Sequence, residues 1–205
     1  MTINTVAVSP QITLASASPR RRELLDQIQV SYTVHSVDID ESHIAGEMPQ
    51  QFVKRLALEK ARTGYLDYPV RPALGSDTIV VFEQHILGKP ESQKMAFEML
   101  HLLSGKTHQV MTAVAICNGE TEHCALSMSE VEFNKLSEQQ IAAYWHTGEP
   151  ADKAGGYGIQ GIAAQFIKNI KGSYSGIMGL PLFETANLLD TFFKEPLIKS
   201  GLEFR

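Results

Sequence analysis

The 205-residue sequence has no hydrophobic run of membrane-spanning length, and its N-terminus has neither a charged leader nor a long apolar segment. These absences predict a soluble protein without a signal peptide. Basic residues are also in the minority, because 18 Lys and Arg against 23 Asp and Glu give a net charge of −5. A nucleic acid polymer or a membrane is therefore not expected as a partner, since polymer recognition requires a broad basic face. A small polyanion held by a few local cations remains compatible with this balance.

Cysteine is scarce as well. Cys117 and Cys124 flank an Asn-Gly pair at residues 118–119, which is a strong hairpin signal. A two-residue turn there would pair Cys117 with Glu120 and place Cys124 opposite Ala113, so no disulfide is expected between the two thiols. Low cysteine use and the lack of a predicted disulfide indicate a reducing, cytoplasmic location.

Several common enzyme motifs are missing or match only in part. The GKT at residues 105–107 resembles the end of a phosphate-binding P-loop, but Leu100 stands where that motif requires glycine. GYGIQG at residues 156–161 fits a dinucleotide fingerprint, yet no strand is expected before it at residues 151–155. The seven histidines show no metal-ligand spacing, and no serine lies on a nucleophile elbow. A Rossmann domain, a zinc site and a serine hydrolase are therefore not predicted, although the glycine-rich loop remains a candidate ligand contact.

The most informative segment is LASASPRRRELL at residues 14–25. An apolar strand at residues 12–15 precedes it, and Ser18 followed by Pro19 is typical of a helix start. Three arginines then fall within the first helical turn. Free backbone N–H groups, the positive end of the helix dipole and guanidinium groups converge there, which predicts an anion site suited above all to phosphate.

The helical period distinguishes the three arginines. The apolar face of this helix is expected to comprise Leu24, Leu25 and Ile28. Arg21 falls near the centre of that face, where a guanidinium requires an anionic partner. Arg20 lies on its flank. Arg22 points outward, where it can pair with Asp26 one turn later.

Two more charged residues are expected to point inward. Residues 31–39 alternate as a strand, and Glu41 extends the apolar row of that strand. A carboxylate there can be a site residue or a charge that reaches solvent, and the spacing supports both interpretations equally. A helix is predicted over residues 49–63, with Lys60 in the middle of its buried stripe. A lysine alone there could extend to solvent, but it is the second inward cation.

Asp77 is the strongest candidate in the chain. Residues 69–82 predict a strand that is apolar on both faces except at positions 76–78. An aspartate in such a strand is rare unless it is paired, binds a metal or is catalytic. Lys89 follows the short return strand and precedes Pro90, at an element boundary. Carboxylates without a Cys or His cluster favour Mg²⁺ or Mn²⁺, so this set indicates a metal-assisted phosphoanhydride hydrolase.

The rest of the chain reads as ordinary α/β structure and predicts one domain, with a core at about residues 12–193. The expected elements are a helix ending at residue 103, strands over 107–117 and 121–133, a helix over 137–145, a strand near 165–170 and a helix over 181–193.

Five blocks together resemble the Maf family of nucleoside triphosphate pyrophosphatases in order and spacing. They are SASPRRREL, the Asp40-Glu41 pair, LALEKA, LGSDTIVV with LGKP, and KAGGYGIQG. The resemblance covers about residues 12–189. It implies a mixed α/β fold like that of the inosine triphosphate pyrophosphatases, with an elongated curved sheet flanked by helices and a central cleft, and it implies a homodimer.

The same resemblance assigns roles to residues of this sequence. It implies that Asp77 accepts the proton of the attacking water and that Glu41, with Asp77, holds the metal. The other implied active-site positions are Ser18, Arg21, Lys60 and Lys89, and those that mark the dTTP/UTP branch are Arg20, Thr78 and Gln160. The implied activity is hydrolysis of dTTP or UTP to the monophosphate and pyrophosphate, as house-cleaning of the nucleotide pool.

Two alternatives remain. The 7-methyl-GTP branch of the family has SPWR in the first block, where this chain has SPRR. A non-catalytic regulator of cell division would need the cations but would have no need for a buried Asp77.

Overall fold

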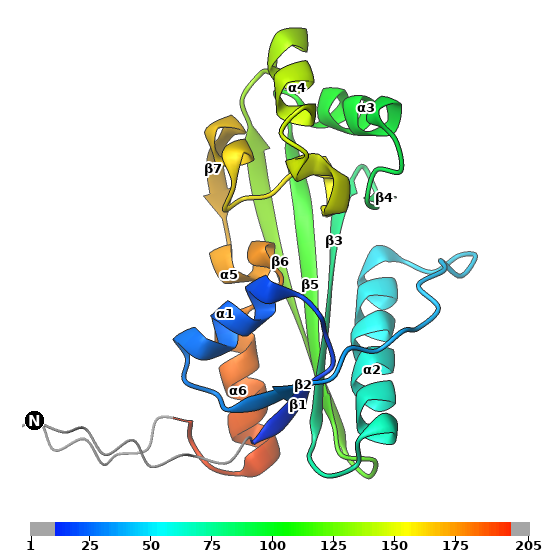
Figure 1. Ribbon diagram of the computed structural model, residues 1–205, viewed down its shortest axis with the longest axis vertical. Helices are drawn as coiled ribbons and strands as arrows, with labels where there is room; N and C mark the ends of the chain where they lie inside the picture. The colour runs from blue at the N-terminus through cyan, green and yellow to red at the C-terminus, as the bar shows by residue number, and fades with distance from the viewer. Residues whose placement is uncertain (1–10, 198–205) are drawn as a thin grey trace, which may run out of the picture.

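The computed structural model describes residues 11–197, which form one mixed sheet with helices on both faces (Figure 1). The strands are β1 (Ile12–Leu14), β2 (Tyr32–Val34), β3 (Ala73–Phe82), β4 (His85–Leu87), β5 (Thr107–Cys117), β6 (Glu122–Phe133) and β7 (Ile167–Lys171). The helices are α1 (Pro19–Gln27), α2 (Pro49–Asp67), α3 (Gln93–Leu103), α4 (Glu138–Trp145), α5 (Tyr174–Met178) and α6 (Leu182–Phe193). The N-terminal residues behind the signal-peptide prediction lie outside the described residues.

The strand order is β2-β1-β3-β5-β6-β7, and β4 pairs with β3. β2, β1 and β3 run parallel, whereas β3, β5, β6 and β7 pair antiparallel. β5 and β6 have 11 and 12 residues, about twice the usual strand length, so the sheet is elongated (Figure 1). This architecture confirms the predicted mixed α/β class. None of the helices within residues 11–197 is long and apolar enough to cross a membrane.

The two faces of the sheet carry different helices. α2 packs its apolar stripe against one face of β3 and β5, through residues such as Leu56 and Ile79. α1 and α6 cover part of the other face, where Leu74 of β3 lies among their leucines. Successive strand residues point to opposite faces, so Asp77 lies on the α2 side with Ile79. Toward the far end of the strands, α3 and α4 close a third apolar cluster around Phe133 (Figure 1).

One edge of β3 is only partly paired. β1 pairs with β3 at Ala73 and Leu74, and β4 pairs with it at Val80 to Phe82. Between these contacts, no described strand pairs with this edge at residues 75–79. The other edge of β3 is paired with β5 from Ala73 to Val81. Asp77 therefore lies in the middle of a stretch of sheet edge with which no described strand pairs.

Most predicted elements are confirmed, and the differences have local causes. The expected strand over residues 31–39 is limited to β2, because its partner β1 has only three residues. The residues at 69–72 precede β3 without joining it, and they include two prolines, which lack the N–H that a ladder requires. α2 continues past the predicted residue 63 to Asp67.

The predicted two-residue hairpin is wrong. Cys117 pairs with Glu122, so the loop contains residues 118–121. The side-chain Oδ1 of Asn118 accepts hydrogen bonds from the backbone N–H groups of Glu120 and Thr121, at 3.1 and 2.8 Å. This Asx-type bonding widens the turn and shifts the register. Both cysteines are free thiols, as expected.

We predict that Gly75→Ala destabilises the fold, because α2 lies directly against β3 at this glycine. A Cβ there would overlap the backbone of Ala57 and Ala61 and lie 3.0 Å from Cβ of Lys60. Overpacking of this kind costs about 1–3 kcal/mol, which urea denaturation would measure. Gly88→Ala is the control, because no atom lies within 4 Å of the place that an added Cβ would take. Equal stability of the two variants would contradict this close packing.

Candidate active site

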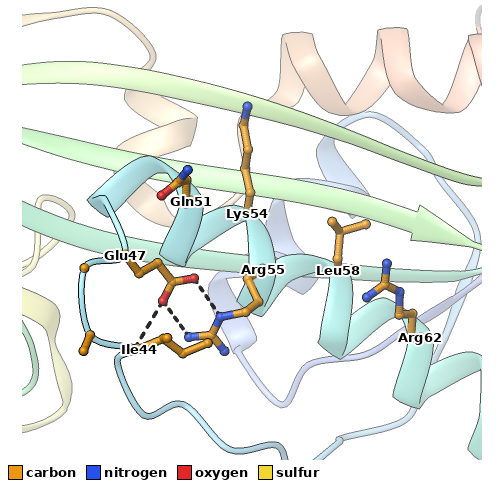
Figure 2. Close-up of a pocket in the computed structure, with 9 residues that line it drawn as sticks. Ile44, Glu47, Gln51, Lys54, Arg55, Leu58 and Arg62 are labelled. Atoms are coloured by element: carbon orange, nitrogen blue, oxygen red, sulfur yellow. Dashed lines mark hydrogen bonds and ion pairs between the residues drawn. The ribbon is translucent and has the colours of Figure 1, made fainter.

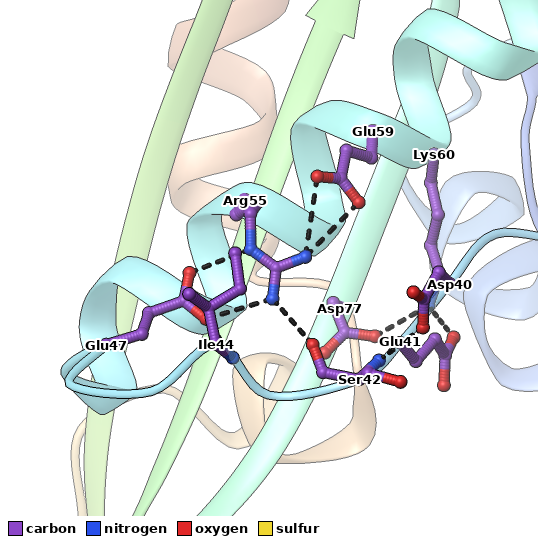
Figure 3. A network of polar contacts seen from close by, with 9 residues as sticks. All are labelled: Asp40, Glu41, Ser42, Ile44, Glu47, Arg55, Glu59, Lys60 and Asp77. Atoms are coloured by element: carbon purple, nitrogen blue, oxygen red, sulfur yellow. Dashed lines mark hydrogen bonds and ion pairs between the residues drawn. The ribbon is translucent and has the colours of Figure 1, made fainter.

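The centre of the candidate site is one ammonium group shared by two carboxylates. Nζ of Lys60 lies 2.7 Å from Oδ1 of Asp77 and 2.6 Å from Oε1 of Glu41 (Figure 3). Lys60 comes from α2, Asp77 from β3 and Glu41 from the segment between β2 and α2. The side chains of Lys60 and Asp77 are only 12% and 11% exposed, whereas that of Glu41 is 54% exposed. The structure therefore brings together three residues that were predicted separately.

The two carboxylates differ in acidity because their surroundings differ. Burial raises the pKa of Asp77, and the nearby Lys60 and Arg21 offset this only in part. Burial also acts upward on the pKa of Glu41, but Lys60, with Lys89 and Arg21, outweighs it and lowers that pKa below its usual range. Paired carboxylates whose pKa values are separated in this way are typical of a site that needs one proton acceptor and one fixed anion.

Each carboxylate keeps one oxygen free of the ammonium. Within residues 11–197, Oδ2 of Asp77 and Oε2 of Glu41 accept no hydrogen bond. The same residues contain no group of three or more His, Cys, Asp or Glu that could hold a metal by themselves. Mg²⁺ commonly takes only one or two carboxylates and fills its remaining positions with water and phosphate oxygens. The donor set of Glu41 and Asp77 therefore fits a hard divalent cation that binds together with a phosphate ligand.

Arg21 reaches the site from the first turn of α1. Its Nε donates to the carbonyl oxygen of Gly179 at 2.9 Å, and its Nη1 donates to Oγ of Ser16 at 3.0 Å. Burial lowers the pKa of Arg21, and the charge of Asp77 acts in the opposite direction. The inward direction predicted from the helical period is confirmed. Two of the five guanidinium N–H donors are used, which leaves capacity for an anion.

The neighbours of Arg21 are arranged differently. Ser18 is the N-cap residue of α1, but its side chain makes no capping bond, so its hydroxyl is free among the described residues. Nε of Arg20 donates to the carbonyl oxygen of Met178 at 3.3 Å. Arg22 is exposed, and the described part of the chain contains no ion pair between it and Asp26, whose carboxylate bonds with the Tyr32 hydroxyl, so that predicted pair is wrong.

The remaining predicted residues lie around this centre without touching it. Thr78 points to the other face of β3, where its Oγ1 lies 3.0 Å from that of Thr112. Lys89 is exposed beyond the end of β4, and its charge contributes to the lowered pKa of Glu41. Gln160 is exposed, and its side chain makes no hydrogen bond within residues 11–197.

The glycine-rich segment is held by close backbone contacts, as its composition predicted. Gly155 donates its N–H to the carbonyl of Gly88 at 3.0 Å, and a Cβ there would meet Val80 at 3.0 Å. A Cβ on Gly161 would overlap the carboxylate of Glu149, which accepts a hydrogen bond from the N–H of Ile162 at 2.7 Å. Gly155 thus allows the segment to pack against Val80 of β3 and Gly88 after β4, and Gly161 allows the loop that carries Gln160 to pack against Glu149.

Three supporting residues were missed by the sequence analysis. Ser16 accepts a hydrogen bond from Arg21, and Ser76 donates to the same Gly179 carbonyl at 3.0 Å. Gly179 itself has a φ of 122°, which favours glycine. The run of small residues before Pro19 could have indicated Ser16. No sequence pattern identifies a backbone carbonyl that becomes the partner of an arginine 158 positions away.

A surface pocket of about 570 Å³ lies elsewhere, between residues 44–47 and the outer side of α2 (Figure 2). None of the predicted site residues lines it. Two of its cations already pair with carboxylates, since Arg55 binds Glu47 and Arg62 binds Glu122. We therefore do not assign a phosphate ligand to this pocket.

The chain is similar to several known proteins. A family profile described as Maf-like protein matches residues 11–192. A dTTP/UTP pyrophosphatase of Saccharophagus degradans is 52% identical over 188 residues, which is 90% of this chain and 90% of the relative. A dTTP/UTP pyrophosphatase of Alkalilimnicola ehrlichii is 52% identical over 189 residues, covering 89% of this chain and 93% of the relative. The solved Staphylococcus aureus Ham1 protein aligns at a TM-score of 0.48 and 12% identity, over 89% of this chain and 97% of that one.

The contrast between Arg21 and Arg22 gives a direct test of the anion site. Arg21→Ala should weaken the binding of inorganic tripolyphosphate about 10- to 100-fold, because it removes charge-assisted hydrogen bonds at a helix start. Arg22→Ala should change the affinity no more than about two-fold, since its guanidinium is exposed. Isothermal titration calorimetry would measure both affinities. Equal losses would show that the anion does not bind at this face of α1.

Proposed function

The chain belongs to the Maf-like protein family, and we propose that it hydrolyses dTTP and UTP to the nucleoside monophosphate and pyrophosphate. The observation that carries this proposal is the Asp77–Lys60–Glu41 group beside the arginine-rich start of α1. It combines a carboxylate of raised pKa with cations suited to phosphates. The names of the relatives at about half identity over nine-tenths of the chain support the substrate class.

The residues of the site have different roles in the cleavage of the phosphoanhydride bond. Arg21, Lys60 and Lys89 offset the negative charge of the triphosphate and of the transition state. The free hydroxyl of Ser18 donates to a phosphate oxygen. Oδ2 of Asp77 accepts the proton of a water whose oxygen attacks the α-phosphorus. The bond from that phosphorus to the oxygen that bridges to the β-phosphate breaks, and pyrophosphate leaves with that oxygen.

We propose that Glu41, with Asp77 beside it, holds Mg²⁺ or Mn²⁺ through the Glu41 oxygen that does not bind Lys60, which leaves Oδ2 of Asp77 free to accept the proton. When bound, such a cation offsets phosphate charge as a Lewis acid. The free Oε2 and the low pKa of Glu41 support this assignment. The protein residues supply the base and the fixed cations in either case.

Nucleotide preference is assigned to Arg20, Thr78 and Gln160. Arg20 flanks Arg21 at the start of α1, and its charge also lowers the pKa of Asp152 in the segment before the glycine-rich loop. Gln160 is exposed on that loop, with an amide free to bind a pyrimidine edge. Thr78 follows the base Asp77 directly in β3.

A nucleotide panel with product identification tests the proposed activity. The purified protein should convert dTTP and UTP to monophosphate and pyrophosphate faster than it converts dATP, dGTP or 7-methyl-GTP. Asp77→Asn should lower kcat by about 10²–10⁴ while leaving the fold and much of the nucleotide binding intact. Because burial raises the pKa of Asp77, wild-type kcat/KM should fall with acid at a pH above the ordinary aspartate range. Near wild-type turnover by Asp77→Asn would refute its role as the base.

Removal of divalent cations tests the metal proposal separately. Dialysis against a chelator should abolish turnover, and added Mg²⁺ or Mn²⁺ should restore it. The protein should remain folded in the chelator, because the cation serves catalysis and is not structural. Full activity in excess chelator would exclude the metal, while the roles of Asp77 and the cations would stand.

We also propose that the protein acts as a homodimer in the cytoplasm. The family resemblance supports the dimer, and the two free thiols agree with a reducing compartment. Sedimentation equilibrium would test the oligomeric state.

A further inference from the structure

The segment that carries Glu41 needs an anchor of its own. Residues 35–48 connect β2 to α2 and contain neither helix nor strand. The Glu41 side chain is half exposed, so its one ion pair, with Lys60, is partly open to solvent. Exposed ion pairs contribute about 0–1 kcal/mol, which does not order a connection of this length.

Arg55 of α2 supplies such an anchor (Figure 3). Its Nε and Nη2 bind the two carboxylate oxygens of Glu47 at 2.8 and 2.9 Å. The same Nη2 donates to the carbonyl oxygen of Ser42, the residue after Glu41, at 3.0 Å. Nη1 donates to Glu59 one turn later on α2, at 3.4 Å. The Glu47 side chain is only 9% exposed.

Local hydrogen bonds also order the backbone around these two contacts. The N–H of Ser42 donates to Oδ1 of Asp40 at 2.9 Å, across Glu41. The N–H of Glu47 donates to the carbonyl of Ile44 at 3.0 Å. With the Ser42 carbonyl and the Glu47 carboxylate both fixed by Arg55, the backbone next to Glu41 is held against α2.

We propose that Arg55 is a positioning residue that holds residues 42–47 so that Glu41 stays beside Lys60. This inference rests on the proposed function. Arg55 has five N–H donors, and four of them already point to Glu47, Ser42 and Glu59, so it has little capacity for a substrate anion. It acts on the reaction through Glu41.

The same helix offers a matched control. Arg62 makes a bidentate pair with Glu122 of β6, with both N···O distances at 2.6 Å. This pair resembles that of Arg55 with Glu47, because both are bidentate and both arginines lie on α2. Arg62, however, makes no hydrogen bond or ion pair with residues 40–47. Lysine at either position keeps the charge and loses the planar fork.

Arg55→Lys should lower kcat/KM about 10- to 100-fold, because a displacement of Glu41 by about 1 Å is enough for such a loss. Amide hydrogen exchange at residues 41–48 should become faster in this variant, because the segment opens locally. Glu47→Gln removes the charged partner of Arg55 and should produce both effects. It provides the same test if Arg55→Lys does not fold. Arg62→Lys should produce neither effect.

A double-mutant cycle distinguishes positioning from a general loss of stability. In the background of Glu41→Gln, Arg55→Lys should cost no more than about two-fold further, because both changes act through one carboxylate. Additive losses, unchanged exchange in Arg55→Lys, or equal effects of Arg62→Lys would each overturn the proposal. If no nucleotide is hydrolysed, the proposed function fails, and the exchange comparison of Arg55→Lys with Arg62→Lys still decides whether Arg55 orders the segment.

Discussion

The site depends on one lysine ammonium placed between two carboxylates. Lys60 carries a single charge, yet it lies within 2.7 Å of oxygens from both Glu41 and Asp77. Removing charged groups from water is costly unless each has a partner, so the buried Lys60 and Asp77 depend on each other, while the more exposed Glu41 adds a second negative charge beside Lys60. The position of the ammonium is in turn fixed by the contact of α2 with β3 at Gly75, where only a hydrogen fits against the helix backbone.

The environment then gives the two carboxylates different properties. Asp77 lies in a strand covered by α2, and burial raises its pKa. Glu41 lies in an exposed connection, and the cations around it lower its pKa. A carboxylate that is harder to ionise is the better proton acceptor, whereas one that stays ionised is the better fixed anion. Asp77 and Glu41 are both carboxylates, and their different exposure makes one the proton acceptor and the other the fixed anion.

The sequence revealed the residues that rigid elements direct inward. Periodicity identified Arg21, Lys60 and Asp77, because each interrupts an apolar face whose direction follows from the helix or strand period. The same reasoning misplaced the hairpin register, since an Asn118 side chain widened the turn. It also missed Arg55, which looks like an ordinary surface residue of an amphipathic helix. Its partners lie in a connection without periodicity, so only the folded structure brings them together.

The unpaired stretch of the β3 edge, at residues 75–79, keeps a neighbouring strand away from the charged residues of the site. Extending β1 or β4 along residues 75–79 would satisfy more backbone groups, but it would also cover Asp77 from the side. Edge groups left open must bind water or a ligand, because buried and unpaired N–H or C=O groups are costly. The chain instead leaves the sheet after Leu14 and turns into α1, which brings Arg21 toward the same stretch of edge. The early end of β1 therefore leaves the edge beside Asp77 without a neighbouring strand and brings the charge of Arg21 close enough to act on that carboxylate.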